Sequence, residues 1–151
     1  MIKLTWDDIE RLTDELAVKI KASDFKPDYI IGITTGGLIP LYFLARKLEN
    51  NRNILTISAN SYTKDNQEDL KILYLPKIDL SDKKILLVDD IVGSGDTLKE
   101  ISNILTNKYE VRELKTVTVV ALKDSKFYPD WYGIEKQEDW IVFPWDKAEF
   151  P

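Results

Sequence analysis

The sequence predicts an α/β fold, in which helices flank a doubly wound, mostly parallel sheet. Apolar runs of strand length alternate along the chain with segments of helical spacing, as in parallel sheets wound with helices. The runs at residues 29–34 and 85–88 are apolar almost throughout, which is typical of strands buried on both faces. Turns of small residues that lead into helical segments follow both runs.

The first predicted element is a helix over residues 6–21. Thr5 can cap it, and Asp7 and Asp8 in its first turn suit the positive end of the helix dipole. Its apolar side chains recur on one face, at the spacing of a helix laid against a core: Ile9, Leu12, Leu16 and Ile20. Pro27 ends the pattern, and a strand is expected to follow.

Hydrophobic periodicity and turn residues place the remaining elements. We expect them in this order: a strand at 29–34, a helix at 38–49, a strand at 54–59, a mobile polar loop at 60–69, strands at 71–75 and 84–88, a helix at 95–107, and strands at 114–122, 131–134 and 141–143. The chain shows no linker, internal repeat or low-complexity segment. Residues 1–151 are therefore expected to form a single domain.

Bulk composition narrows the class of protein. Hydrophobic residues make up 44% of the 151 residues and charged residues 31%, as in ordinary globular proteins. The net charge of −5 argues against general nucleic-acid binding. No apolar stretch has the length of a membrane span, and the amino terminus does not begin a secretory signal. We expect a cytoplasmic protein that binds neither membranes nor nucleic acid.

Two residue types are missing from the chain. There is no histidine, which excludes histidine-based triads and histidine metal sites. There is also no cysteine, which excludes thiol nucleophiles, disulfides and cysteine–zinc sites. Any metal would have oxygen ligands, which points to Mg²⁺ held by carboxylates and substrate phosphates.

Residues 85–97, ILLVDDIVGSGDT, carry the clearest functional signal. Asp89 and Asp90 fall at the carboxyl end of a predicted buried strand, where open α/β sheets bind their ligands. The small-residue turn that follows can direct several N–H groups at one anion, beside the positive end of a helix: Gly93, Ser94, Gly95, Asp96 and Thr97. Carboxylates beside a phosphate cradle indicate a site for a phosphorylated sugar.

This segment resembles the signature of the type I phosphoribosyltransferases, which bind phosphoribosyl pyrophosphate (PRPP). Other glycine-rich motifs fit less well, because no lysine follows Gly95 as in a P-loop, and Leu98 stands where the dinucleotide fingerprint has its third glycine. The resemblance runs from the segment Thr5-Trp6-Asp7 to the segment Pro144-Trp145-Asp146. It is closest to the small bacterial xanthine–guanine phosphoribosyltransferases and their archaeal purine-salvage relatives.

The resemblance implies roles for particular residues. Asp89 and Asp90 would be the catalytic residues and contact the ribose hydroxyls. The turn at residues 93–97 would hold the 5′-phosphate, and Thr35, Gly36 and Gly37 would bind the pyrophosphate of PRPP. The implied metal is Mg²⁺, with Asp89, Asp90 and Asp146 as the expected protein ligands.

The resemblance also implies a site for the base. Trp140 would stack on the purine, main-chain groups around Ile141 would read one edge of it, and Lys123 would donate a hydrogen bond to O6 of a 6-oxopurine. These residues would belong to a small carboxyl-terminal hood, and the loop at 60–69 would close over the site. The implied enzyme is a pentosyltransferase of purine salvage. It would convert PRPP and xanthine, guanine or hypoxanthine into a nucleoside monophosphate and pyrophosphate, as a homodimer or homotetramer.

The chain departs from the family pattern at three positions. Gly93 stands where purine enzymes usually have an aspartate that takes the proton from purine N7. Thr35 replaces a usual arginine or lysine, and Glu68 lies where the loop usually has a basic residue. Two alternatives therefore stay open: a non-catalytic sensor of nucleotides or PRPP on the same fold, and a phosphoribosyltransferase for a non-purine base.

Overall fold

The computed structural model describes residues 1–50, 52–64, 67–137 and 140–146, without the side chains of residues 62–64, 67 and 68. Its elements in chain order are β1 (Ile2–Lys3), α1 (Trp6–Ala22), β2 (Tyr29–Thr34), α2 (Leu38–Lys47), β3 (Ile54–Lys64), β4 (Gln67–Tyr74), β5 (Lys84–Val92), α3 (Asp96–Asn107), β6 (Glu113–Leu122), β7 (Trp131–Lys136), β8 (Ile141–Val142) and the 3-10 helix η1 (Pro144–Asp146). The predicted alternation of strands and helices is confirmed.

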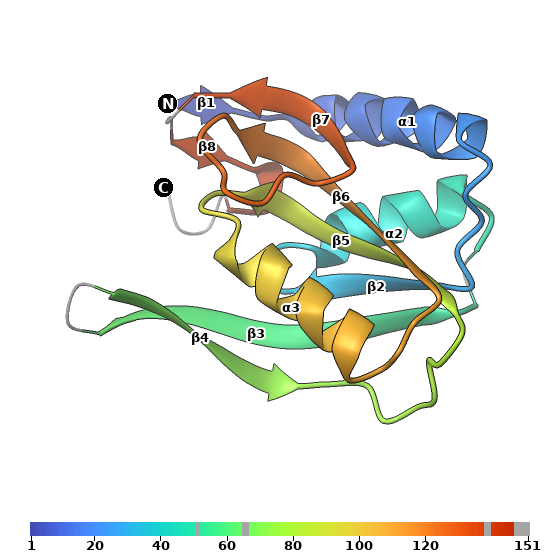
Figure 1. The fold of residues 1–151 in the computed structure, drawn as a ribbon. Helices are drawn as coiled ribbons and strands as arrows, with labels where there is room; N and C mark the ends of the chain where they lie inside the picture. Colours follow the sequence, from blue (N-terminus) through green and yellow to red (C-terminus); the bar gives the residue numbers. More distant parts are fainter. Residues whose placement is uncertain (51, 65–66, 138–139, 147–151) are drawn as a thin grey trace.

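The central sheet has the strand order β4-β3-β2-β5-β6-β7. Every neighbouring pair in it is parallel except β3 and β4. Helices α1 and α2 cover one face, and α3 covers the other (Figure 1). Strand β5 shows why its run is apolar throughout: Leu86 and Val88 pack on the side of α1 and α2, while Ile85 and Leu87 pack on the side of α3.

Helix α1 begins as its sequence predicts. The Thr5 hydroxyl accepts a hydrogen bond from the Asp8 N–H at 3.1 Å, and the Asp8 carboxylate accepts one from the Thr5 N–H at 2.8 Å. The four apolar residues expected on its inner face are all buried. This helix packs beside α2 on the sheet and fixes one wall of the domain.

The segment predicted as a mobile loop at 60–69 is instead the outer part of a β-hairpin. Strand β3 continues to Lys64 and pairs with β4 in antiparallel register, with Ser61 opposite Leu70. A register irregularity lies between Ser58 and Ala59, next to the body of the sheet. The hairpin projects past the carboxyl ends of the parallel strands (Figure 1), and its tip at 65–66 lies outside the described residues.

The two ends of the chain meet in a second, two-stranded sheet. Strands β1 and β8 pair in parallel, with Ile2 opposite Ile141. Ile141 of β8 packs on a third apolar cluster, which joins α1, β6 and the segment after β8. Within the described residues, no helix is both long enough and apolar enough to cross a membrane.

The chain connections locate a binding crevice before any side chain is considered. Strand β2 passes through α2 to β3 on one side, whereas β5 passes through α3 to β6 on the other. The direction of winding therefore reverses between β2 and β5, which are hydrogen-bonded neighbours. Ligands of open α/β sheets bind at such a switch point, beyond the carboxyl ends of the strands.

Candidate active site

Asp89 and Asp90 lie in the last four residues of β5, on the β5 side of the switch point. Strand β5 is longer than predicted, running to Val92, so both acids are held by strand geometry and not by a loop. Because neighbouring side chains in a strand point to opposite faces, the two carboxylates address different parts of the crevice. The Asp89 carboxylate accepts a hydrogen bond from the Asp90 N–H at 2.9 Å.

Asp90 faces the turn that follows β2. A Cβ added to Gly36 would lie 2.2 Å from Oδ2 of Asp90, so the carboxylate occupies the space that a side chain at 36 would need. Gly37 is equally confined, since a Cβ there would lie 2.6 Å from the carbonyl oxygen of Ile33. Both glycines are required for the β2 turn to approach β5 this closely. Thr35, next to Gly36, is joined to Thr34 by a cis peptide bond.

Asp89 faces the other side, where a cavity of about 260 Å³ lies against the turn after β5. Four residues of the turn line this cavity: Gly93, Ser94, Gly95 and Thr97. Asp96 starts α3 but does not line the cavity. Gly95 has a φ of 93°, a left-handed conformation that favours glycine, and it caps the amino terminus of α3. The helix dipole therefore points its positive end at the cavity.

Burial shapes the electrostatics of the acidic pair. It raises the pKa of the Asp89 carboxyl well above its usual range, and the charge of Asp90 raises it further. Burial also raises the pKa of Asp90, although hydrogen bonds from its surroundings oppose the shift. Two desolvated carboxylates on consecutive residues are costly without partners. The pair thus suits ligands that supply hydroxyl donors or positive charge.

Asp146, in η1, is close enough to Asp90 to contribute to the rise in its pKa. Its carboxylate accepts a hydrogen bond from the Phe143 N–H at 2.9 Å, which fixes its position. No three acidic side chains of the described residues form a ready-made metal cluster. The donor set consists of carboxylate oxygens, which fits Mg²⁺ bound largely through the phosphates of a substrate.

The three residues predicted to bind the base lie on the hood and on the end of β6. Lys123 directly follows β6, is exposed, and donates its N–H to the carbonyl oxygen of Lys136 at 2.9 Å. Trp140 precedes β8 and is 60% exposed. Ile141 is half-buried, and its side chain packs on the apolar cluster of the hood. The carbonyl oxygen of Trp140 accepts a hydrogen bond from the Ile2 N–H at 2.8 Å.

The other tryptophans of the carboxyl-terminal half pack internally. Trp145 stacks on Phe143 at 4.6 Å between ring centroids, with the ring planes inclined by 6°. Trp131 lies 6.1 Å from Phe25 and packs against the core on the side of α1 and α2. Of the tryptophans at 131, 140 and 145, Trp140 is therefore the one with a largely exposed face.

Of the three positions that depart from the family pattern, the structure describes the surroundings of Gly93 and Thr35. Among the described residues, no atom lies within 4 Å of the place that a Cβ at Gly93 would take. The turn therefore has room for a side chain that the sequence does not supply. Thr35 begins the β2 turn, where its carbonyl oxygen accepts the Leu38 N–H at 3.1 Å. The side chain of Glu68 lies outside the described residues.

Three polar residues that the sequence did not single out lie at the turn. Ser61 of β3 and Thr118 of β6 line the cavity with Asp89. The Ser61 hydroxyl lies 3.4 Å from that of Thr97. Ser125, after β6, donates hydrogen bonds to the turn from behind. No local pattern marks these positions, because each comes from a segment distant in sequence from residues 93–97.

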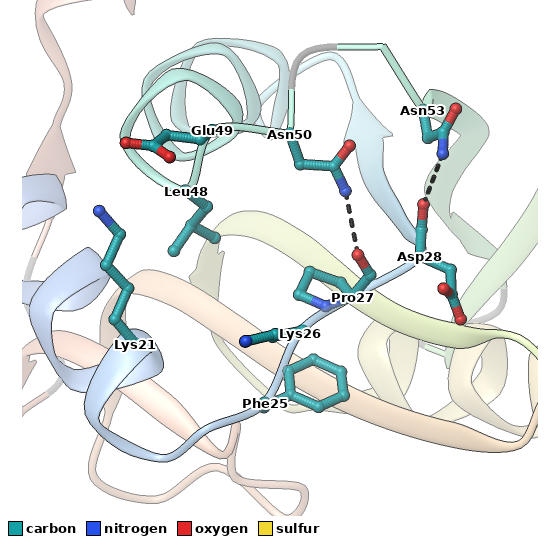
Figure 2. A pocket seen from close by; sticks show the side chains of 9 residues that line it. All are labelled: Lys21, Phe25, Lys26, Pro27, Asp28, Leu48, Glu49, Asn50 and Asn53. Carbon is teal, nitrogen blue, oxygen red and sulfur yellow. Dashed lines mark hydrogen bonds between the residues drawn. The ribbon is translucent and has the colours of Figure 1, made fainter.

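A separate cavity of about 460 Å³ (Figure 2) lies where β2 and β3 begin. Two of its polar side chains are hydrogen-bonded to the main chain. The Asn50 amide donates to the carbonyl oxygen of Pro27 at 3.1 Å, and the Asn53 amide donates to that of Asp28 at 3.0 Å. None of the residues predicted for the site lines this cavity. The acidic pair and the turn at 93–97 therefore mark the candidate active site.

Comparison with known proteins identifies the family of the chain. The family profile of the phosphoribosyl transferase domain matches residues 4–148. The xanthine-guanine phosphoribosyltransferase of Cereibacter sphaeroides is 33% identical over 153 aligned residues, which cover 96% of this chain and 86% of the relative.

Two solved structures share both the fold and part of the sequence. The purine phosphoribosyltransferase from Pyrococcus horikoshii superposes with a TM-score of 0.83 and 32% identity, covering 95% of this chain and 92% of the other. A hypothetical protein from Neisseria gonorrhoeae, solved with bound ppGpp, also has a TM-score of 0.83, with 28% identity, and covers 96% of this chain and 89% of the other.

Proposed function

The chain belongs to the phosphoribosyl transferase domain family, and from this premise we propose that it is a purine-salvage phosphoribosyltransferase. It transfers the 5-phosphoribosyl group of PRPP to a 6-oxopurine and releases pyrophosphate. In this reaction the bond from ribose C1 to pyrophosphate breaks, and a bond from C1 to a purine nitrogen forms. The purine loses a proton, and the products are a nucleoside monophosphate and pyrophosphate.

One observation carries the proposal: the two carboxylates of β5 stand between two main-chain turns that can each hold an anion. Asp89 lines the cavity under the turn at 93–97, and Asp90 packs on the Gly36-Gly37 turn. A ribose whose hydroxyls meet the acidic pair would reach one turn with its 5′-phosphate and the other with its pyrophosphate. PRPP carries these groups on one sugar ring.

Mg²⁺ belongs to this proposal. When bound, the ion supplies positive charge that neutralises the leaving pyrophosphate. Asp89, Asp90 and Asp146 would hold it together with oxygens of PRPP. The residues around the crevice orient the sugar, and a site closed to water keeps PRPP from hydrolysis. The β3–β4 hairpin projects beyond the strand ends and is placed to cover the crevice (Figure 1).

The base would bind between the hood and the end of β6. The exposed face of Trp140 suits stacking on a flat heterocycle. The carbonyl oxygens of Trp140 and Val142 accept hydrogen bonds from the N–H groups of Ile2 and Leu4. Because successive main-chain groups of a strand point in opposite directions, those of Ile141 face the other way and are suited to an edge of the purine. Lys123 has only donors, which favours an O6 over an amino group.

Gly93 bears on which 6-oxopurine is used. Without a carboxylate at this position, the chain does not offer the usual acceptor for the N7 proton. A base that already ionises in solution, such as xanthine, depends on such an acceptor least. We therefore expect xanthine to be the better substrate. The proposal also includes a single domain over residues 1–151, a cytoplasmic location and assembly into a homodimer or homotetramer.

The test is release of pyrophosphate from PRPP and Mg²⁺, with xanthine, guanine, hypoxanthine, adenine, orotate and uracil offered one at a time. Turnover with at least one 6-oxopurine is the expected result. Turnover with orotate or uracil alone would show instead that the base is a pyrimidine. If no base led to release of pyrophosphate while PRPP still bound, the transferase proposal would be refuted.

A second candidate function is a nucleotide sensor on the same fold. It is favoured by the N. gonorrhoeae relative with bound ppGpp and by the lack of a carboxylate at Gly93. A sensor would bind PRPP or a nucleoside monophosphate saturably but turn over no base. The pyrophosphate assay separates the two functions directly.

A further inference from the structure

The turn at 93–97 is held from behind by the three residues 125–127, which follow the predicted base-reading Lys123. The Ser125 hydroxyl donates to the Val92 carbonyl oxygen at 3.1 Å and also contacts the carbonyl oxygen of Gly93. The Lys126 N–H donates to the Ser94 carbonyl oxygen at 2.8 Å. The carbonyl groups of three consecutive residues, the last of β5 and the first two of the turn, are thus tied to one short segment.

The third residue of the segment, Phe127, lies in close contact with the backbone of the turn at Gly95. A Cβ added to Gly95 would lie 2.6 Å from the main-chain nitrogen of Phe127. The Phe127 side chain packs against the core on the side of α3. Residues 125–127 therefore form a continuous support under the turn, which we call the 125–127 clamp.

The clamp has a direct consequence for anion binding. In a planar trans peptide unit, the C=O and the following N–H point in opposite directions. The carbonyl groups of Val92, Gly93 and Ser94 are directed at the clamp, so the N–H groups that follow them point away from it. Gly93, Ser94 and Gly95 line the cavity on that other side. Holding the carbonyl groups back keeps the N–H groups available for a phosphate.

We infer that Ser125 is a positioning residue for the 5′-phosphate, acting through the backbone of the turn at 93–97. The inference rests on the proposed function only in that a phosphorylated ribose occupies the cavity. Ser125 does not line the cavity and so touches no ligand there. The segment is itself fixed at both of its ends: the Ser125 N–H donates to the Leu122 carbonyl oxygen at 3.1 Å, and Phe127 is anchored in the core.

The test compares Ser125→Ala with Ser125→Thr, which keeps the hydroxyl, and with Ser125→Cys, which keeps the size but donates weakly. The readouts are the Kd for GMP by calorimetry and the KM values for PRPP and for the base. We expect Ser125→Ala and Ser125→Cys to raise the Kd for GMP and the KM for PRPP by about three- to tenfold, the range for loss of one or two hydrogen bonds. The KM for the base should change by less than about twofold, because the base loses no hydrogen bond and even one lost bond costs more than this. Ser125→Thr should restore phosphate binding.

Ser102→Ala is the matched control. Ser102 is buried on α3, and its hydroxyl has no hydrogen-bond partner among the described residues. Its removal should leave the Kd for GMP unchanged. Equal binding of GMP by Ser125→Ala and the unaltered chain would overturn the clamp, as would an equal rise in the KM for the base. So would failure of Ser125→Thr to restore binding.

The binding readout also separates this inference from the proposed function. If the unaltered chain binds GMP but turns over no base, the proposed transferase fails, while the Kd series still tests the clamp. If the unaltered chain turns over and Ser125→Ala retains full affinity for GMP, the clamp alone fails. If the unaltered chain binds neither GMP nor PRPP, both fail.

Discussion

The carboxylate of Asp90 fills the space that a side chain at Gly36 would need. Its Oδ2 atom lies 2.2 Å from the position that a Cβ at residue 36 would take. This contact joins the two strands at the switch point, β2 and β5, through their functional ends. It explains why a glycine stands at the second position after β2. A substitution at Gly36 can therefore displace the Asp90 carboxylate while Asp90 itself is kept.

Gly36→Ala should displace the Asp90 carboxylate while leaving the fold intact, because the crowded atoms belong to the end of a side chain. Loss of a charged hydrogen bond costs about 1.5–3 kcal/mol, so we expect the KM for PRPP to rise at least about tenfold. Ser102→Ala is the control, since Ser102 is buried on α3 and does not line the cavity. Steady-state kinetics and thermal melts check both variants, and similar KM values for the two would contradict the role of this contact.

Replacing Asp89 and Asp90 together with Asn should abolish PRPP binding while the protein stays folded. The acids provide both the acceptors for the ribose hydroxyls and the oxygens for Mg²⁺ in the proposed site. Calorimetric titration with PRPP and Mg²⁺ measures the loss, and circular dichroism checks the fold. Unchanged affinity for PRPP would refute the role of the pair.

The acidic pair should also lower the stability of the free protein at neutral pH. Burial raises the pKa of the Asp89 carboxyl, so the folded state binds its proton more tightly than the unfolded state does. Its favourable contribution is complete below the unfolded pKa of about 3.9 and is lost as the pH rises through the raised folded pKa. Asp89→Asn should therefore melt at a higher temperature than the unaltered chain at pH 7.

The gain from Asp89→Asn should shrink as the pH is lowered toward 4. Asp7→Asn serves as control, because Asp7 is exposed in the first turn of α1, where a negative charge suits the helix dipole. That control should melt at the same or a slightly lower temperature. Thermal melts across this pH range decide the matter, and a gain that stays constant with pH would show that the desolvated charge is not its cause.

The regularly wound core could be predicted from the sequence because its signals are local. Strand β2 matches its predicted range, since a continuous apolar run lies between Pro27 and the Gly36-Gly37 turn. The capping box of α1 and its buried face were predictable for the same reason. Asp89 and Asp90 were located by their place after a buried run, although β5 continues past them to Val92.

The parts that were missed depend on partners distant in sequence. The β3–β4 hairpin was taken for a loop because its outer residues are polar, and an exposed antiparallel pair needs no apolar run. Strand β1 has two residues and exists through its pairing with β8, at the other end of the chain. The hydrogen bond from Ser125 to the carbonyl oxygen of Gly93 joins residues 32 positions apart and has no local signature.

Gly93→Asp should increase the rate with hypoxanthine. The open space at position 93 accepts a side chain without steric conflict, and the new carboxylate would stand where the purine family usually has its proton acceptor. General-base catalysis contributes about 10²–10⁴-fold when fully aligned, so a gain of at least about tenfold in single-turnover rate is expected. Gly93→Asn keeps the size without the base. If Asp and Asn gave the same rate, the proton acceptor would not be what this chain lacks.

Stacking by Trp140 can be tested apart from the sugar site. Trp140→Ala should raise the KM for the base by about five- to a hundredfold, since stacking of one base on an aromatic ring is worth about 1–3 kcal/mol. The Kd for PRPP should stay unchanged, because the hood does not contribute to the turns after β2 and β5. Tyr42→Ala removes an exposed ring of α2 and serves as control. An equal loss of affinity for PRPP and for the base would show a general disturbance of the hood.

The unaltered chain should become more active as the pH rises, because Gly93 offers no acceptor for the proton of the base. With glycine at 93, the fraction of free base that is already deprotonated limits the rate, so activity should climb until the base is fully ionised. Xanthine should therefore reach its plateau at a lower pH than hypoxanthine does. In Gly93→Asp the carboxylate would accept the proton, and the profile should flatten across the neutral range. Rates of pyrophosphate release for both bases at saturating PRPP provide the measurement; a flat profile in the unaltered chain would mean that another group takes the proton, because glycine cannot.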